Sequence, residues 1–93
     1  MNQQQPVKKL MVSGGSPVRE LAGSIIKSYD SGERNIELRA IGASSVNKMY
    51  KALATPRGIF SQRGLDMTLK PGYDETEING EKRTVMLARL VIQ

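Results

Sequence analysis

Two short segments rich in glycine and serine are the places in this 93-residue sequence where backbone amides and hydroxyls could hold a phosphate. Gly14-Gly15-Ser16 and Gly42-Ala43-Ser44-Ser45 each follow a strand-like run and precede a helix-like run. Free amides at a helix N-terminus, together with the helix dipole, attract anions. The first segment has neither the lysine of a P-loop nor the glycine spacing of a dinucleotide-binding turn. Each segment is therefore either a phosphate contact or a tight turn that begins a helix.

Cations lie close to the second segment in the sequence. Arg39 comes just before it, and Lys48 and Lys51 follow one to two helical turns beyond. Two strand-to-helix loops should emerge at the same edge of a sheet, where amides, hydroxyls and cations would meet a backbone phosphate. The alternative is a set of separate, solvated features. The candidate nucleic-acid contacts in this part of the chain are Gly15, Ser16, Arg39, Gly42, Ser44, Ser45 and Lys48.

A third candidate region surrounds an apolar pair, Ile59 and Phe60, with Arg57 and Arg63 on either side. We count both arginines as supporting nucleic-acid contacts. If Ile59 and Phe60 are exposed, they form a self-association patch, and they are the candidate oligomer interface. If they are buried they close the core, and the sequence alone favours burial.

The pair Asn79-Gly80 predicts a hairpin, because both central residues of a type I′ turn have positive φ. Lys82 and Arg83 beside it suit a β-arm that enters a nucleic-acid groove. Glu77 and Glu81 oppose that role. A structural turn and a binding arm are equally good interpretations of this segment.

Enzymatic functions have little support in this sequence. It contains no cysteine and no histidine, which excludes disulfides, thiol nucleophiles, imidazole or thiolate metal sites and histidine acid–base chemistry. Asp74, Glu75 and Glu77 are close carboxylates, and a strand would place Glu75 and Glu77 on one face. No second ligand group accompanies them. We therefore predict a protein that is not an enzyme and that uses no metal and no cofactor.

Hydrophobic periodicity and turn residues predict six elements in the order β-α-β-α-β-β. Two strand–helix–strand crossings and a terminal hairpin predict an α+β two-layer sandwich, with a mixed four-stranded sheet and both helices on one face. The expected strands are 7–13, 34–41, a third strand in two parts (65–70 and 75–78) interrupted at Pro71-Gly72, and 83–92. The helices are expected after Ser16 and after Ser45.

Several residues set the expected limits of these elements. Ser16 is expected to cap the first helix, with Pro17 at its first position, and Gly32 to end it in a left-handed conformation. The second helix is expected to bury Tyr50 in its apolar stripe and to close at Pro56. The continuous apolar run in the first strand predicts a strand that is covered on both faces or central in the sheet.

Length and composition fit one small domain, residues 7–93, preceded by a disordered polar lead, residues 1–6. The net charge is +5. Residues 34–70 hold seven basic and two acidic residues, so the basic surplus sits in the middle of the chain. Such a segment suits a polyanion partner, although an ordinary solvated face has the same composition. Without an apolar span or a signal-like start, we expect a cytoplasmic protein with no membrane contact.

These residues resemble the Alba superfamily of nucleic-acid-binding proteins. The resemblance lies in residues 10–18 (LMVSGGSPV), residues 36–53 (IELRAIGASSVNKMYKAL) and residues 57–60 (RGIF). Within the superfamily, the sequence is most similar to the stage V sporulation protein S family. That similarity includes residues 11–13 (MVS), 39–43 (RAIGA), Asn47 and 80–84 (GEKRT), and it spans roughly residues 9–91.

The sequence also departs from these families. Archaeal Alba proteins place nucleic-acid-binding lysines in the first loop, where this chain has Gly15 and Ser16. This departure implies weaker electrostatic binding or a shift to amide and hydroxyl contacts. The resemblance implies a homodimer, with a tetramer as the alternative, whose two copies form one basic surface. It also implies a bacterial regulatory role in sporulation or development.

We therefore expect a dimeric module that binds DNA or RNA through backbone phosphates, with low sequence specificity, in the cytoplasm and in association with the nucleoid. The alternative is a protein-interaction adaptor on the same fold, which would use Ile59 and Phe60 or the acidic hairpin. A regulator that binds a small phosphate-containing ligand in the two glycine loops is a third hypothesis. Fold-level resemblance does not choose among these functions.

Overall fold

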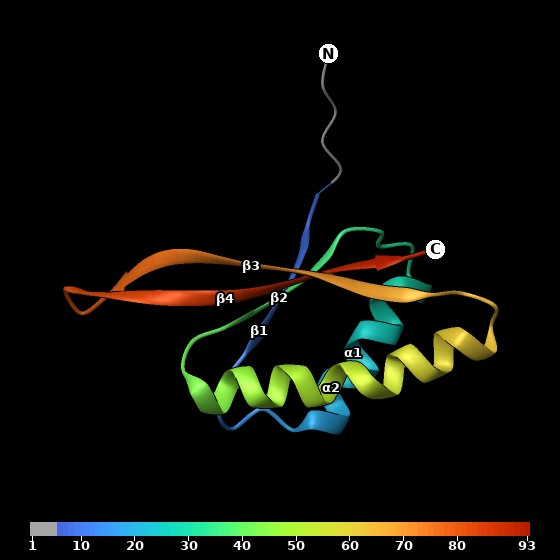
Figure 1. Ribbon diagram of the computed structural model, residues 1–93, viewed down its shortest axis with the longest axis horizontal. Helices are drawn as coiled ribbons and strands as arrows, with labels where there is room; N and C mark the ends of the chain where they lie inside the picture. Colours follow the sequence, from blue (N-terminus) through green and yellow to red (C-terminus); the bar gives the residue numbers. More distant parts are fainter. Residues whose placement is uncertain (1–5) are drawn as a thin grey trace, which may run out of the picture.

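A computed structural model describes residues 6–93, so the disordered lead predicted for residues 1–6 lies, except for Pro6, outside the described residues. The described chain forms four strands and two helices in the predicted order (Figure 1). The elements are β1 (Lys8–Val12), α1 (Val18–Asp30), β2 (Ile36–Ala40), α2 (Ala43–Gln62), β3 (Met67–Ile78) and β4 (Glu81–Ile92).

The four strands make one mixed sheet in the order β1-β2-β4-β3. β1 and β2 are parallel, and the other two pairs are antiparallel. Both helices pack on the same face of this sheet, and no helix of the described residues lies on the other face (Figure 1). The predicted α+β fold with a mixed four-stranded sheet is therefore confirmed. Neither helix of the described chain is long and apolar enough to cross a membrane.

The core lies between the sheet and the helices. Alternate residues of β2 point into it, and Ile36, Leu38 and Ala40 are each no more than 1% exposed. Full burial of such a side chain stabilises the fold by about 1.5–3 kcal/mol. The buried cluster includes Val12, Leu21, Ile25, Ile36, Leu38, Ala40, Met49, Ala52, Leu53, Phe60, Met67, Ala88 and Leu90.

The first strand is an edge strand, contrary to the prediction of a central or doubly covered one. β1 pairs only with β2, and its Met11 side chain is 66% exposed on the face that has no helices. Val12 is buried and Leu10 packs against the core from the helix side. The apolar run therefore does not mark a central strand, because one of its three side chains faces solvent.

Both helices end in the same closed motif. After α1, Gly32 has φ +99°, as predicted for a left-handed residue, and its N–H donates to the Tyr29 carbonyl at 3.0 Å. The Glu33 N–H donates to the Ser28 carbonyl at 3.0 Å, which completes a Schellman motif. These bonds satisfy carbonyls that would otherwise lack partners at the helix end.

The prediction that Pro56 closes the second helix is wrong. α2 continues through Pro56, Gly58, Ile59 and Phe60 to Gln62. Proline in a helix interior removes one backbone hydrogen bond. Here its ring is buried in the core, and the apolar spacing Met49, Ala52, Leu53, Pro56 and Phe60 continues on one side of the helix. Packing of that side therefore offsets the lost bond.

Phe60 is fully buried, and Ile59 is half-buried. The Phe60 ring meets the Tyr29 ring edge-on at a centroid distance of 5.0 Å. Phe60 therefore belongs to the core, and the prediction of Phe60 as an oligomer interface is wrong. The Ile59 interface stays a prediction. Tyr50, expected in the buried stripe, is instead 73% exposed.

The expected break at Pro71-Gly72 is also absent. β3 runs without interruption from Met67 to Ile78 and pairs with β4 along its whole length. β3 is an edge strand, and an edge is where a sheet tolerates proline, because a missing N–H need not cost a ladder bond. The predicted Asn79-Gly80 turn is confirmed, since Asn79 has φ +52° and Gly80 has φ +81°.

Candidate nucleic-acid interface

The two glycine loops meet at one end of the sheet, as predicted. β1 and β2 are parallel neighbours, so their C-terminal ends, Val12 and Ala40, lie at the same end of the sheet. The two loops are in contact: Gly14 lies so close to Ser44 that a Cβ atom on Gly14 would be only 3.2 Å from Ser44 Oγ. We call residues 13–16 and 42–45 together the loop edge.

The first loop is closed by its own serines. The Ser13 N–H donates to Ser16 Oγ at 2.9 Å, the two hydroxyls lie 3.1 Å apart, and the Ser16 N–H donates to the Ser13 carbonyl at 3.1 Å. The prediction that Ser16 caps α1 is therefore wrong, because its hydroxyl is used within the turn. Pro17 is the N-cap residue and has no side chain that can cap the helix.

The second helix also begins without a side-chain cap. Its N-cap residue is Gly42, with φ +90°, and Ser44 and Ser45 lie in the first turn instead of preceding it. Within residues 6–93, the first amides of both helices therefore have no side-chain cap. Ser44 is exposed, whereas Ser45 is only 6% exposed, so Ser44 is the accessible serine of this loop.

Two cations flank the loop edge. Lys48 is half-buried one turn into α2, as predicted. Arg19 is exposed in the first turn of α1 and was missed by the sequence analysis. Its signal was available, because Pro17 marks the start of a helix and Arg19 follows two residues later. The loop edge thus combines two positive helix ends with two nearby cations, and Glu20 in the first turn of α1 adds one negative charge.

The hairpin projects beyond the loop edge (Figure 1). β2 ends at Ala40, which pairs with Met86, so beyond this rung β3 and β4 pair only with each other. We call residues 74–85 the arm. Lys82 and Arg83 are exposed near its tip, and Lys82 lies opposite Glu77 in the register of the two strands. The arm carries four carboxylates against these two cations, namely Asp74, Glu75, Glu77 and Glu81.

Arg39 does not join the loop edge. It lies on the helix-free face, where it donates to Glu37 Oε2 at 3.0 Å and approaches Asp74 Oδ2 at 3.4 Å. Because β4 lies between β2 and β3, the pair with Asp74 crosses over β4. Burial raises the pKa of Glu37, but hydrogen bonds from Arg89 and Arg39 outweigh burial and hold that pKa below its ordinary value. Arg39 is thus engaged with two carboxylates.

Arg57 and Arg63 also lie away from the loop edge. Arg63 is the C-cap residue of α2, and at ~1.5 Å per residue it lies about 28 Å from Ser44. It donates to both oxygens of Asp30, at 2.6 and 3.3 Å, and its guanidinium lies 5.6 Å from the centre of the Phe60 ring. Arg57 is exposed in the middle of α2, beside β3. The structure therefore does not bring these two arginines together with the loops.

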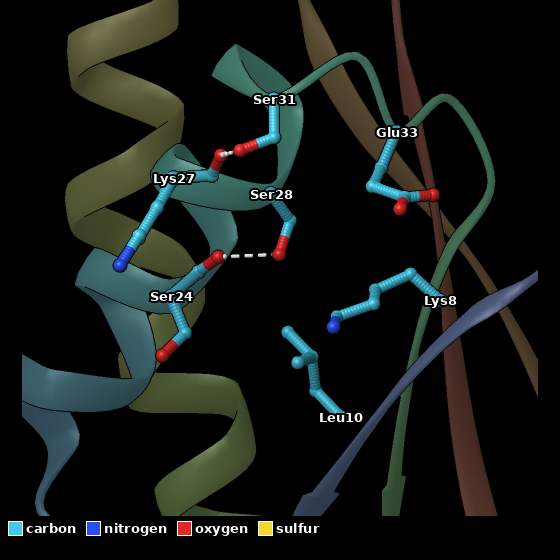
Figure 2. A pocket seen from close by; sticks show the side chains of 7 residues that line it. All are labelled: Lys8, Leu10, Ser24, Lys27, Ser28, Ser31 and Glu33. Atoms are coloured by element: carbon cyan, nitrogen blue, oxygen red, sulfur yellow. Dashed lines mark hydrogen bonds between the residues drawn. The ribbon is translucent and has the colours of Figure 1, made fainter.

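A depression of about 280 Å³ lies between β1 and the C-terminal half of α1 (Figure 2). Its serine hydroxyls face inward to the helix: Ser28 donates to the Ser24 carbonyl at 2.7 Å and Ser31 to the Lys27 carbonyl at 2.8 Å. The Lys8 side chain reaches into this space from β1 (Figure 2). Because the negative end of the helix dipole lies here, this depression is a poorer phosphate site than the loop edge.

Comparison with solved structures gives the fold. The chain is similar to Alba from Thermoplasma volcanium with a TM-score of 0.57 and 13% sequence identity, over 88% of this chain and 99% of that one. At this identity, the likeness shows the Alba fold and nothing more specific. A family model described as "Stage V sporulation protein S (SpoVS)" matches residues 8–93, which is nearly the whole chain. The chain therefore belongs to the stage V sporulation protein S family.

Proposed function

We propose that this protein is a non-enzymatic regulator that binds nucleic acid through the loop edge and contacts backbone phosphates with little sequence preference. The observation that carries the proposal is the meeting of two helix N-termini without side-chain caps at one sheet edge, where Gly14 approaches Ser44. Amides at such helix ends bind phosphate oxygens, and the two dipoles add to the attraction. The sporulation family and the Alba fold support the same role.

The contacts fall into two kinds. The backbone amides near Gly15 and Gly42 and the exposed hydroxyl of Ser44 would position a phosphate without reading sequence. Arg19 and Lys48 would add charge next to it, with Lys82 and Arg83 at the tip of the arm. Release of counterions from the nucleic acid then dominates the free energy of binding, so affinity falls steeply with salt. Such a protein would work in the cytoplasm, in association with the nucleoid, in bacterial development.

The test is fluorescence anisotropy with labelled duplex DNA, single-stranded DNA and RNA, each across a salt series. The double substitution Arg19→Ala and Lys48→Ala should weaken binding about tenfold at low salt and reduce the salt slope by about 2, since each lost cation frees roughly one phosphate contact. The rank order of the three ligands identifies the substrate.

The matched control is the double substitution Lys27→Ala and Arg34→Ala. It removes the same charge at and just after the C-terminal end of α1, where Arg34 donates to the Tyr29 carbonyl, far from the loop edge. This control should bind like the wild type. Equal losses in the two double variants would mean that only net charge matters, and no binding by the wild-type protein at low salt would overturn the proposal.

We also propose that the protein is a homodimer, and we place its interface between α2 and β3 instead of at Phe60. A groove of about 360 Å³ lies there, lined by residues that include Tyr50, Leu53 and Leu69. The helix side of β3 continues from Leu69 to Tyr73, which pairs with Met86 on β4. Tyr50, Tyr73 and Met86 are 73%, 71% and 38% exposed. A continuous apolar surface of this kind suits a second copy of the chain.

Light scattering after gel filtration tests the dimer. Tyr50→Lys and Tyr73→Lys should each shift the mass from two chains to one without unfolding the monomer, because both side chains are largely exposed in the single chain. Ile59→Lys distinguishes this interface from the one predicted from the sequence. If Ile59→Lys gives monomers and the two tyrosine variants remain dimers, the α2–β3 interface is wrong.

A further inference from the structure

The helix-free face of the sheet carries a line of charged side chains that the loop edge does not use. The register pairs Lys9 with Glu37, Glu37 with Arg89, and Arg89 with Lys70. Paired residues of neighbouring strands project to the same face, so the four side chains cross all four strands in one row. With strands ~4.8 Å apart, the row is about 14 Å long. We call Lys9, Glu37, Arg89 and Lys70 the sheet row.

The one carboxylate of the sheet row is already engaged. Glu37 is 2% exposed, its Oε1 accepts from Arg89 at 2.9 Å, and its Oε2 accepts from Arg39 at 3.0 Å. Within the described part of the chain, neither Lys9 nor Lys70 takes part in an ion pair. Toward solvent, the sheet row therefore presents three cations and no free carboxylate.

Two of these cations repel each other. Lys70 and Arg89 are direct partners on β3 and β4, and like charges in that position destabilise a sheet. Both are exposed, and the Arg89 side chain is 57% accessible. Beside them is a depression of about 180 Å³, lined in part by Gly72, Leu87 and the already engaged Glu37. Gly72 has no side chain, so an anion in this depression would lie against Lys70 and Arg89 and relieve their repulsion.

We propose that the sheet row is a second nucleic-acid contact, in which Lys9, Arg89 and Lys70 bind backbone phosphates of a strand that lies across the helix-free face. Three cations around a saturated carboxylate complement a line of phosphates, whereas they offer nothing to an apolar partner. None of the four aromatic residues lies in the row: Tyr29, Tyr50 and Phe60 are on helices, and Tyr73 is on the helix side of β3. The contact is therefore electrostatic and does not stack bases.

The sheet row is separate from the loop edge in the structure. Lys9 and Glu37 each precede the C-terminal end of their strand by three residues, and their side chains point away from the helices. Only the nature of the ligand rests on the proposed function, since the evidence for the site comes from the sheet. The two sites can therefore be tested independently.

The test compares two double variants with equal loss of charge. Lys9→Gln with Lys70→Gln removes the unpaired cations of the sheet row, and Lys8→Gln with Lys27→Gln removes two lysines from the helix side. For labelled single-stranded and duplex DNA, the sheet-row variant should bind about tenfold more weakly at low salt, with a salt slope smaller by about 2. The control variant should bind like the wild type.

Lysine acetylation of the wild-type complex gives a second readout that does not depend on a variant. Bound nucleic acid should protect Lys9 and Lys70 from acetylation and leave Lys8 and Lys27 reactive. Polyglutamate of similar length is the comparison ligand. If polyglutamate protects Lys9 and Lys70 as well as DNA does at equal charge, the row is not selective for phosphates, and the proposal is overturned.

The outcomes separate this inference from the proposed function. If the sheet-row variant binds like the wild type while the Arg19 and Lys48 variant is weakened, the inference is wrong and the loop edge stands. If only the sheet-row variant is weakened, the inference stands and the loop edge falls. Loss in both supports both sites, and no binding by the wild type overturns both.

Discussion

At their C-terminal ends α1 and α2 satisfy their last carbonyls within the chain, whereas at their N-terminal ends both helices begin without a side-chain cap. We call the C-terminal helix ends, residues 28–33 and 60–65, the closed end, and the loop edge with the N-terminal turns of both helices the open end. The closed end repeats one motif: the Leu65 N–H donates to the Phe60 carbonyl at 2.8 Å, as the Glu33 N–H does to the Ser28 carbonyl. Asp30 and Arg63 then join the two helix ends. The open end has two loops in contact and amides without caps.

This difference indicates where the fold keeps its stability and where it keeps its capacity to bind. Serine at an N-cap is worth about 1 kcal/mol, yet Ser16 turns its hydroxyl to Ser13 and leaves the helix start uncapped. Sites that bind ligands commonly give up such stabilisation. We therefore expect substitutions at the closed end to change stability and leave binding alone, whereas substitutions at the open end change binding.

The largest expected effect is at Phe60, at the closed end. Phe60→Ala should lower the free energy of unfolding by about 4 kcal/mol, because it empties a fully buried site against Tyr29. Urea denaturation followed by circular dichroism measures this loss. Ile59→Ala is the control and should cost far less, since Ile59 is only half-buried. A Phe60 variant of nearly wild-type stability would show that the closed end is not the stable one.

The next effect concerns Gly64, which follows the end of α2, and Gly58, which lies inside that helix. Gly64 has φ +77°, so Gly64→Ala should cost about 1–2 kcal/mol by forcing a side chain into the left-handed region. Gly58 lies in the interior of α2 with open space around it, so Gly58→Ala should instead stabilise the protein by about 0.5–1 kcal/mol. Thermal unfolding of both variants reports the opposite signs, and equal signs would contradict the role of Gly64.

The elements of this fold could be predicted from sequence because each carries its own periodicity and its own turn residues. Asn79-Gly80 and Gly32 have the backbone angles that their types predict. The two prolines could not be interpreted in the same way. Whether proline breaks an element depends on what surrounds it, and here Pro56 fills the core and Pro71 sits on an edge strand.

The candidate site was predictable in part for a similar reason. The meeting of the two loops follows from parallel strands, which is a property of topology. The partners of the arginines could not be predicted from topology, because Arg39 approaches an aspartate 35 residues away and Arg63 pairs with one 33 residues away. Only the folded chain shows that these two cations are engaged by Asp74 and Asp30. Arg89, which no local motif marks, gains its place in the sheet row from strand register.

A side-chain cap added at the start of α1 should increase the stability of the protein and weaken its binding of nucleic acid. Pro17 has φ −68° and ψ 126°, which an aspartate or serine N-cap can adopt. Pro17→Asp should stabilise the protein by about 0.5 kcal/mol, because the new cap outweighs the lost rigidity of proline. Its carboxylate would occupy the amides of α1 and repel phosphate, so binding should weaken several-fold. Denaturation and anisotropy of the same samples measure both effects.

Two further variants separate charge from capping at this position. Pro17→Ser adds a neutral cap and should weaken binding less than Pro17→Asp, whereas Pro17→Ala adds no cap and should leave binding unchanged. Unchanged binding in all three variants would mean that the α1 amides do not contact the ligand. The missing cap of α1 would then have no role in binding, and the two ends of the helices would not divide stability from binding.

The smallest expected effect is the acid dependence of the closed end. Hydrogen bonding to Arg63 holds the pKa of Asp30 below its ordinary value of 3.8. A carboxylate whose pKa is lower in the folded state stabilises the protein above its unfolded pKa, and this contribution is lost as the pH falls through the folded pKa. Asp30→Asn should therefore slightly lower the melting temperature at pH 7 and make it fall less steeply below about pH 4. Nucleic-acid binding at pH 7 should be the same in both proteins, because Asp30 lies at the end of the helix layer opposite the loop edge. If the two melting curves stay parallel from pH 7 to pH 3, the Asp30–Arg63 pair does not stabilise the closed end, and the Schellman motifs and Phe60 alone account for its stability.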